Sequence, residues 1–163
     1  MATRLTLLLC VVFFAQGCTT TTPTTTAVVN IGGETFKLEL ALDQSSRTNG
    51  MMNRTSIPPD GGMLFVFTDS SERSFWMKNC FVDIDIIFLD SRGTITALHE
   101  MPVEPPQGAD ESEWNYEGRL AKYWARGPSR FAIELTAGSI KRLNLRINDR
   151  IKLDLAQLKS MAR

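Results

Sequence analysis

Hydrophobic and polar residues alternate along most of the chain after about residue 27, and this alternation predicts short β-strands. Residues 36–42 show it most clearly, with an apolar side chain at every second position, the period of a strand with one buried face. Residues 63–67 form a continuous apolar run, which predicts a strand covered on both faces. Further strands are expected over 74–77, 84–89, 94–101, 131–136 and 150–155.

Two brief helices are expected among these strands. Asp43 is predicted to cap a helix over 44–49, and Gly50 is predicted to end it. A second short helix is expected near 139–143. Because strands dominate and no strand–helix–strand spacing occurs, we expect a mainly β fold, an antiparallel sandwich or a distorted barrel with one or two short helices.

A long loop is expected over 102–128. It contains four prolines and the aromatic residues Trp114, Tyr116, Tyr123 and Trp124. Loops of this length in compact domains are commonly functional or mobile. The aromatic rings either stack on sugar rings or cover the open end of a barrel, and the sequence leaves both interpretations open.

The N-terminus has the pattern of an export signal. Arg4 precedes an apolar run over 5–15, which as a helix would rise about 16 Å and falls short of the roughly 30 Å hydrocarbon layer. Small residues follow, with Ala15 and Gly17 ahead of Cys18. Residues 1–17 are therefore predicted to be a signal peptide.

Residues 18–27 are predicted to be an extended tether. Residues 19–26 consist of threonines and one proline, a segment with no apolar face to bury. Cys18 at the start of the mature chain is similar to the acylated cysteine of bacterial lipoproteins, and more than one acyl chain anchors a protein stably. We expect a lipid-anchored protein of the bacterial cell envelope, or a secreted or periplasmic one if Cys18 is not lipidated.

Composition and charge narrow the function classes. Eighteen basic and eighteen acidic side chains give a formal net charge of zero, whereas nucleic-acid binders usually carry a basic surplus. Within the predicted domain over 28–163, Cys80 is the one cysteine, so no disulfide framework is expected. His99 is the only histidine of the chain, and no metal-ligand spacing or cofactor motif is present. No metal, cofactor or nucleic-acid partner is predicted.

Several blocks of the predicted domain resemble the DUF192 family, also called UPF0127. The blocks are Met51-Met52-x-Arg54, Gly62-Met63-Leu64-Phe65-Val66-Phe67, Ser74-Phe75-Trp76-Met77-Lys78-Asn79, Asp85-Ile86-Ile87-Phe88, Phe131-Ala132-Ile133-Glu134-Leu135 and Asp149-Arg150-Ile151. The resemblance covers about residues 36–153. It implies an exported or envelope-attached domain with a mostly β, barrel-like fold, and it implies no particular activity. The chain departs from the family pattern at Cys80, where threonine is common, and at Asp83 and Ile84, where Pro-Leu is common.

Polar residues inside these blocks are the candidate site. Strand alternation would place Trp76 and Lys78 on one face and Asn79 on the other. Asp85 interrupts an apolar strand, and a buried carboxylate needs a cation or several donors. Arg54 and Lys78 are the available cations.

Glu134 lies in the predicted strand over 131–136, where it faces either the same interior or water. Two interpretations remain for these polar residues: a small-ligand site, or a buried polar network that sets strand register. The candidate ligand-binding residues are Arg54, Trp76, Lys78, Asn79, Asp85 and Glu134.

Three functions are compatible with these residues. The first is an envelope domain that binds a small polar ligand or a cell-wall component. The second is a hydrolytic enzyme of unknown class that uses carboxylates such as Asp83 and Asp85, which lie two apart on one strand face. A nucleophile pair of Cys80 and His99 would require neighbouring strands. The third is a scaffold whose polar residues only specify the fold.

Overall fold

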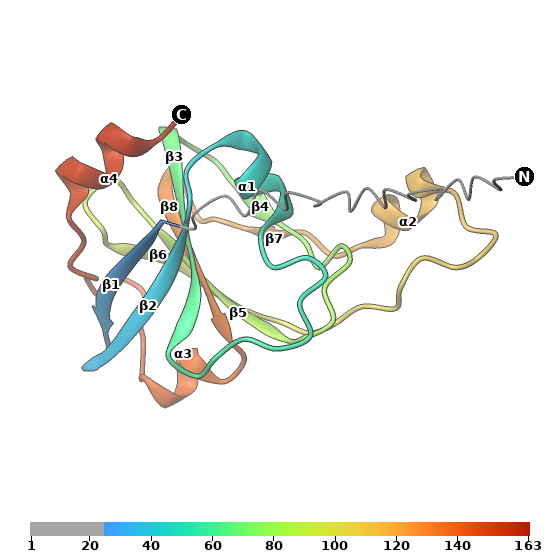
Figure 1. The fold of residues 1–163 in the computed structure, drawn as a ribbon, viewed down its shortest axis with the longest axis horizontal. Coiled ribbons are helices and arrows are strands. Elements are labelled where there is room, and N and C mark those ends of the chain that lie inside the picture. Colours follow the sequence, from blue (N-terminus) through green and yellow to red (C-terminus); the bar gives the residue numbers. More distant parts are fainter. Residues whose placement is uncertain (1–24) are drawn as a thin grey trace, which may run out of the picture.

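The computed structural model describes residues 25–163, so the predicted signal peptide (1–17), Cys18 and most of the tether lie outside the described residues. The strands of the main sheet are β1 (Thr26–Ile31), β2 (Glu34–Ala41), β3 (Gly61–Ser71), β5 (Ile84–Leu89), β6 (Ile95–Met101) and β8 (Ser129–Thr136). A small second sheet pairs β4 (Ser74–Phe75) with β7 (Tyr123–Trp124). The helices, all short, are α1 (Gln44–Asn49), α2 (Glu113–Arg119), α3 (Ser139–Arg142) and α4 (Leu155–Met161) (Figure 1). The prediction of a mainly β fold is confirmed.

The main sheet is mixed rather than wholly antiparallel. Its strand order is β1-β2-β3-β8-β5-β6, and β2 pairs with β3 in parallel. A parallel pair needs a crossover connection, which is supplied by the segment over 42–60 with α1 inside it. The expectation that no strand–helix–strand unit occurs was therefore wrong, because α1 is too short to resemble the usual crossover helix. In the described part of the chain β1 and β6 are edge strands, so the sheet does not close into a barrel.

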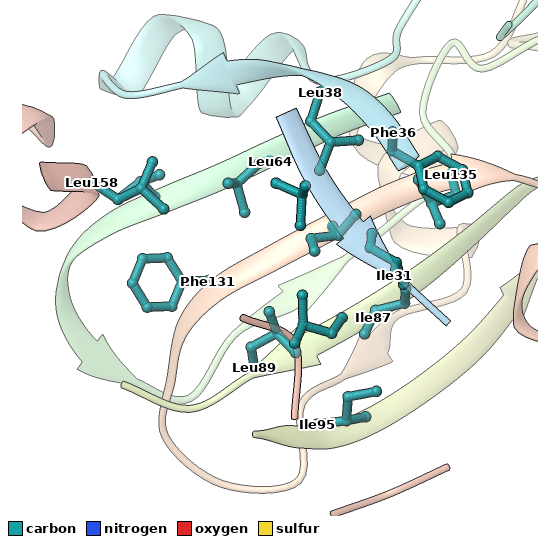
Figure 2. Packing of buried hydrophobic residues seen from close by; sticks show 14 of the residues in the cluster. Ile31, Phe36, Leu38, Leu64, Ile87, Leu89, Ile95, Phe131, Leu135 and Leu158 are labelled. Carbon is teal, nitrogen blue, oxygen red and sulfur yellow. The ribbon is translucent and has the colours of Figure 1, made fainter. Parts of the chain in front are cut away.

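Both faces of the main sheet are covered by apolar side chains. Alternation along β8 sends Phe131, Ile133 and Leu135 into one cluster, which is completed by side chains from the C-terminal segment such as Leu143 and Leu158 (Figure 2). The opposite face carries a second cluster: Ala41, Met51, Met63, Phe65, Met77, Cys80, Ile84, Ile86, Phe88, Ala97, Met101, Ala125 and Ala132. Strands β3, β5 and β8 are therefore buried between two layers.

Single elements were predicted correctly where the residues that define them are close together in the sequence. Helix α1 has the predicted bounds, and Asp43 caps it by accepting a hydrogen bond from the Ser46 backbone N–H at 2.8 Å. The predicted strand over 74–77 is shorter, since only Ser74–Phe75 pairs. The predicted strand over 150–155 was wrong. Arg150 forms one isolated bridge, and Asp154 then caps α4.

The predicted loop over 102–128 contains two elements, α2 and β7. Figure 1 shows α2 set apart from the main sheet at the end of two extended segments. Strand β7 brings the chain back against β4. Among residues 25–163 no helix is both long and apolar enough to cross a bilayer.

Candidate functional site

A cleft of about 540 Å³ opens beside the second apolar cluster. Its lining comes from α1 and the turn after it, from β3, and from the β3–β4 connection with β4, and it includes Trp76, Cys80, Lys122 and Glu134. Elements that are far apart in the sequence thus meet around one hollow. We call it the Glu134 cleft, because Glu134 is a buried carboxyl group of its lining whose Oε2 has no hydrogen-bond partner in the described part of the chain.

Glu134 is buried because of its place in the sheet. Strand β8 lies between β3 and β5, with Glu134 opposite Met63 on one side and Ile86 on the other. Its side chain points into the apolar cluster on that face, and the residue is 4% exposed. Burial raises the pKa of Glu134 to about 8, and the nearby charge of Arg54 opposes this rise only partly. The carboxyl group is therefore mostly protonated at neutral pH.

The Glu134 carboxyl group reaches the cleft next to Gly50. Its Oε2 atom is buried and has no hydrogen-bond partner among the described residues. A Cβ atom built on Gly50 would lie 3.6 Å from Oε2 and 3.3 Å from the Phe65 ring. Since Gly50 also lines the cleft, its missing side chain leaves space in front of the carboxyl group. Buried polar groups normally have partners, so this unpartnered one is unusual.

Aromatic rings form the walls of the Glu134 cleft. Phe75 packs edge to face against Phe65, with ring centroids 4.8 Å apart, and against Phe67 at 6.5 Å. The Trp76 ring carries the Lys122 ammonium group over its face, with Nζ 3.3 Å from the ring centroid. Partial desolvation lowers the pKa of Lys122. Lys122 thus joins the loop before β7 to the wall of the cleft.

Arg73 is the second cation of the wall. Its guanidinium group lies 4.1 Å from the centroid of the Phe67 ring and forms an ion pair with Asp69. Its Nε atom is buried and lacks a hydrogen-bond partner among the described residues. Within residues 25–163, the lining of the cleft therefore has two buried side-chain polar atoms without hydrogen-bond partners, Arg73 Nε and Glu134 Oε2.

Cys80 lines the cleft as a neutral thiol. It is 6% exposed, and its Sγ lies 3.5 Å from the Lys78 carbonyl oxygen, to which the thiol can donate. Burial, with a smaller contribution from Glu134, raises the pKa of Cys80 to about 12. A thiol with so high a pKa forms little thiolate, the nucleophilic form. The His99 Nε2 atom lies 2.8 Å from the Trp124 carbonyl oxygen, and among the described residues no hydrogen bond joins His99 to Cys80, so the structure does not form the hypothetical nucleophile pair.

Lys78 and Asn79, two predicted site residues, hold α2 instead of lining the cleft. The Lys78 ammonium group pairs with Glu113, and with Glu117 at 2.5 Å, and these carboxylates raise its pKa. The backbone N–H of Asn79 donates to the Tyr116 hydroxyl oxygen at 3.0 Å. Asn79 has a φ of 53°, a left-handed turn conformation that asparagine tolerates.

Arg54 lies in a separate depression beside β2. Its guanidinium group forms a two-pronged ion pair with Glu39, with N–O distances of 2.5 and 2.7 Å. It is therefore already paired, and it affects Glu134 only as a nearby positive charge. Of the six predicted site residues, the structure brings Trp76 and Glu134 together in the cleft and separates the other four from it.

Asp85 lies on the opposite face of the sheet from Glu134. It is fully buried, and its Oδ2 accepts a hydrogen bond from the Ile140 backbone N–H at 2.7 Å. Gly138 is the N-cap residue of α3 and has no side chain that could cap the helix. Asp85 therefore supplies the acceptor for a backbone N–H in the first turn of α3. Asp83 is exposed and accepts from the Val103 backbone N–H at 2.7 Å. Asp83 and Asp85, which were expected to form a carboxylate pair, therefore each accept a backbone hydrogen bond that stabilises the fold.

The sequence did not identify the cations of the cleft or two of its aromatic rings as candidate site residues. These are Arg47, Arg73, Lys122, Phe67 and Phe75. No spacing signal connects them, because the pairing of β4 with β7 brings residues near 73 and 122 together. Among residues 25–163 no group of three or more histidine, cysteine, aspartate or glutamate side chains could hold a metal ion.

We predict that Asp85→Ala lowers the free energy of unfolding by about 2 kcal/mol, because it removes a helix cap and leaves the Ile140 N–H buried without an acceptor. Asp85→Asn keeps an acceptor oxygen and should cost roughly half as much. Denaturant unfolding of both variants measures the difference. Equal stability of the alanine variant and the wild type would contradict a capping role.

We predict that Glu134→Gln changes the pH dependence of stability. The pKa of Glu134 is about 8 in the folded chain, against a model-compound value of 4.5. The folded state therefore binds the extra proton, and stability should fall by roughly 3 to 5 kcal/mol as the pH rises across this interval. Glutamine does not titrate, so the stability of the variant relative to the wild type should increase by that amount as the pH rises. Exposed Glu72→Gln is the matched control, and it should follow the wild type; parallel profiles for Glu134→Gln would refute the assignment.

Comparisons with known proteins agree with this fold. A crystal structure of a "putative transcription regulator" from Sinorhizobium meliloti 1021 is similar to the chain, with 34% identity and a TM-score of 0.65 over 79% of this chain and 94% of that one. A protein of unknown function from Novosphingobium aromaticivorans DSM 12444 shares the fold at 23% identity, with a TM-score of 0.62 over 80% and 85%. A comparison with curated proteins found no match. The family model of DUF192, described as "Uncharacterized ACR, COG1430", matches residues 27–153, and the chain belongs to this family.

Proposed function

We propose that the protein is an exported binding module that holds a small ligand in the Glu134 cleft. The single observation that carries this proposal is the buried Oε2 atom of Glu134, which lines the cleft and has no partner in the described part of the chain. A buried polar group without a partner costs about 1–3 kcal/mol. A ligand that supplies the missing hydrogen bond would recover part of this free energy.

The dimensions and chemistry of the cleft support a small molecule. Its volume of about 540 Å³ lies in the range of small-molecule sites, which combine apolar walls with a few polar groups. Here Phe67, Phe75 and Trp76 supply the walls, and Arg73 and Glu134 each supply a buried polar atom for which residues 25–163 offer no partner. A ligand with a flat apolar body and one or two polar atoms matches this lining.

The same geometry favours binding over hydrolysis. Acid–base hydrolysis of the glycosidase type needs two carboxyl groups, but the predicted pair of Asp83 and Asp85 lies outside the cleft, and each accepts a backbone hydrogen bond. Of the carboxylates in the lining, Asp69 is paired with Arg73. The thiol of Cys80 is held neutral by burial. Transcription regulation, the function named for the relative from Sinorhizobium meliloti, would require nucleic-acid binding if it acted directly on DNA, and the zero net charge disfavours that here.

We predict that Trp76→Ala weakens the binding of small aromatic amides, such as benzamide, by about tenfold, because it removes a wall of the cleft. Ligand-detected NMR on the full chain measures the affinity. Trp114→Ala is the matched control, since Trp114 is 84% exposed on α2 and lies outside the cleft. Equal affinities of the two variants would place the bound ligand elsewhere, and absence of binding to the wild type would overturn the proposal.

The export and anchoring part of the proposal rests on the sequence of residues 1–27. We predict that Cys18→Ala moves the protein from the membrane fraction to the soluble fraction, because acyl chains on Cys18 would hold it at the lipid surface. Fractionation of bacterial cells that express the full chain checks this. Retention of the variant in the membrane fraction would contradict lipidation at Cys18.

A further inference from the structure

We infer that the ligand of the Glu134 cleft is recognised as a hydrogen-bond acceptor, through a carbonyl or carboxylate oxygen that accepts from the Glu134 carboxyl group. This inference rests on the proposed function and names the chemical class of its ligand. Its basis is the arrangement of donors around the hollow, from the floor of the cleft to its rim.

The floor of the cleft offers an O–H donor. Glu134 is 4% exposed, on a strand covered on both faces, and an isolated carboxylate in such surroundings is much more costly than a neutral acid. The charged or titratable groups that face it are Arg54, after α1, and the Cys80 thiol, before β5. Arg54 is engaged by Glu39, and Cys80 is neutral. Neither neighbour therefore compensates a negative charge on Glu134 fully.

The wall of the cleft offers N–H donors. Arg73 Nε is buried and has no acceptor among the described residues, whereas Nη2 of the same guanidinium group donates to Asp69. Lys122 presents its ammonium group at the Trp76 ring. Arg47 also lines the cleft, but its guanidinium group already donates to the carbonyl oxygens of Leu42, Val66 and Arg163. Asp69 and Glu72 stand among the lining residues as well, but Asp69 is already paired. Arg73 Nε therefore remains as a buried donor of the lining without a partner in the described part of the chain, and a ligand oxygen is complementary to it.

An ammonium ligand is a poor match for the same cleft. Aromatic rings attract cations over their faces, but here Arg73 lies over Phe67 and Lys122 lies over Trp76. A ligand cation would have to displace these groups and meet their positive charges at close range. It would also require Glu134 to lose its proton inside the apolar cluster. A neutral or anionic acceptor avoids each of these costs.

Two probes of the same size separate the classes. Benzamide presents a carbonyl oxygen, and benzylamine presents an ammonium group on the same ring. At about pH 6, benzamide should bind the full chain at least about tenfold more tightly than benzylamine, the difference expected for one hydrogen bond to a buried group. Ligand-detected NMR measures both affinities under identical conditions.

The pH dependence provides a second measurement that needs no variant. Benzamide is neutral throughout, so its affinity should fall by about tenfold between about pH 6 and pH 9.5 as Glu134 loses its proton. Glu134→Gln keeps a permanent N–H donor and should bind benzamide with little change across this range. The variant therefore separates titration of Glu134 from titration of Lys122.

The outcomes distinguish this inference from the proposed function. If benzylamine binds as tightly as benzamide, or if benzamide binding rises with pH, the cleft still binds small molecules but the acceptor assignment is overturned. If Glu134→Gln abolishes benzamide binding while remaining folded by circular dichroism, the assignment is also overturned. If neither probe binds the wild type, the proposed function fails together with the inference.

Discussion

The burial of β8 on both faces is the constraint on which the rest of the structure depends. This strand lies between β3 and β5, and its alternating side chains enter two different apolar clusters. Any polar residue on it must therefore either find a partner inside the protein or stay neutral. Glu134 has no hydrogen-bond partner for Oε2 among the described residues, so the carboxyl group is held in its protonated form next to a hollow.

Asp85 shows how the same constraint is met in the opposite way. It pairs with Leu135 in the neighbouring strand and points to the other face of the sheet, where the backbone N–H of Ile140 donates to it. Asp85 therefore fixes a helix terminus through Oδ2, while its Oδ1, like Glu134 Oε2, has no hydrogen-bond partner among the described residues; of the two carboxyl groups, only that of Glu134 lines the cleft. Close approach of the strands supports this arrangement, since a Cβ atom on Gly62 would lie 2.4 Å from the Glu134 carbonyl oxygen.

The sequence predicts those features that depend on neighbours along the chain. The capped helix α1 and the apolar strand β5 follow from local pattern. The predicted strand over 150–155 is wrong, because alternating hydrophobicity there does not lead to strand pairing beyond the isolated bridge of Arg150, and the Asp154 cap then starts α4, which was not predicted. The cleft was only partly predictable. Trp76 and Glu134 were identified, but Arg73 and Lys122 meet through pairing of β4 with β7, which no local signal reports.

The protonation state of Glu134 is the most direct test of this account. Carbon-13 NMR of the side-chain carboxyl group, followed across the pH range in the full chain, reports its titration without any ligand. The account predicts that the carboxyl carbon remains in its protonated state at neutral pH and titrates with a pKa near 8. Titration near the ordinary glutamate value of 4.5 would contradict it, because the carboxyl group would then have to be solvated or paired.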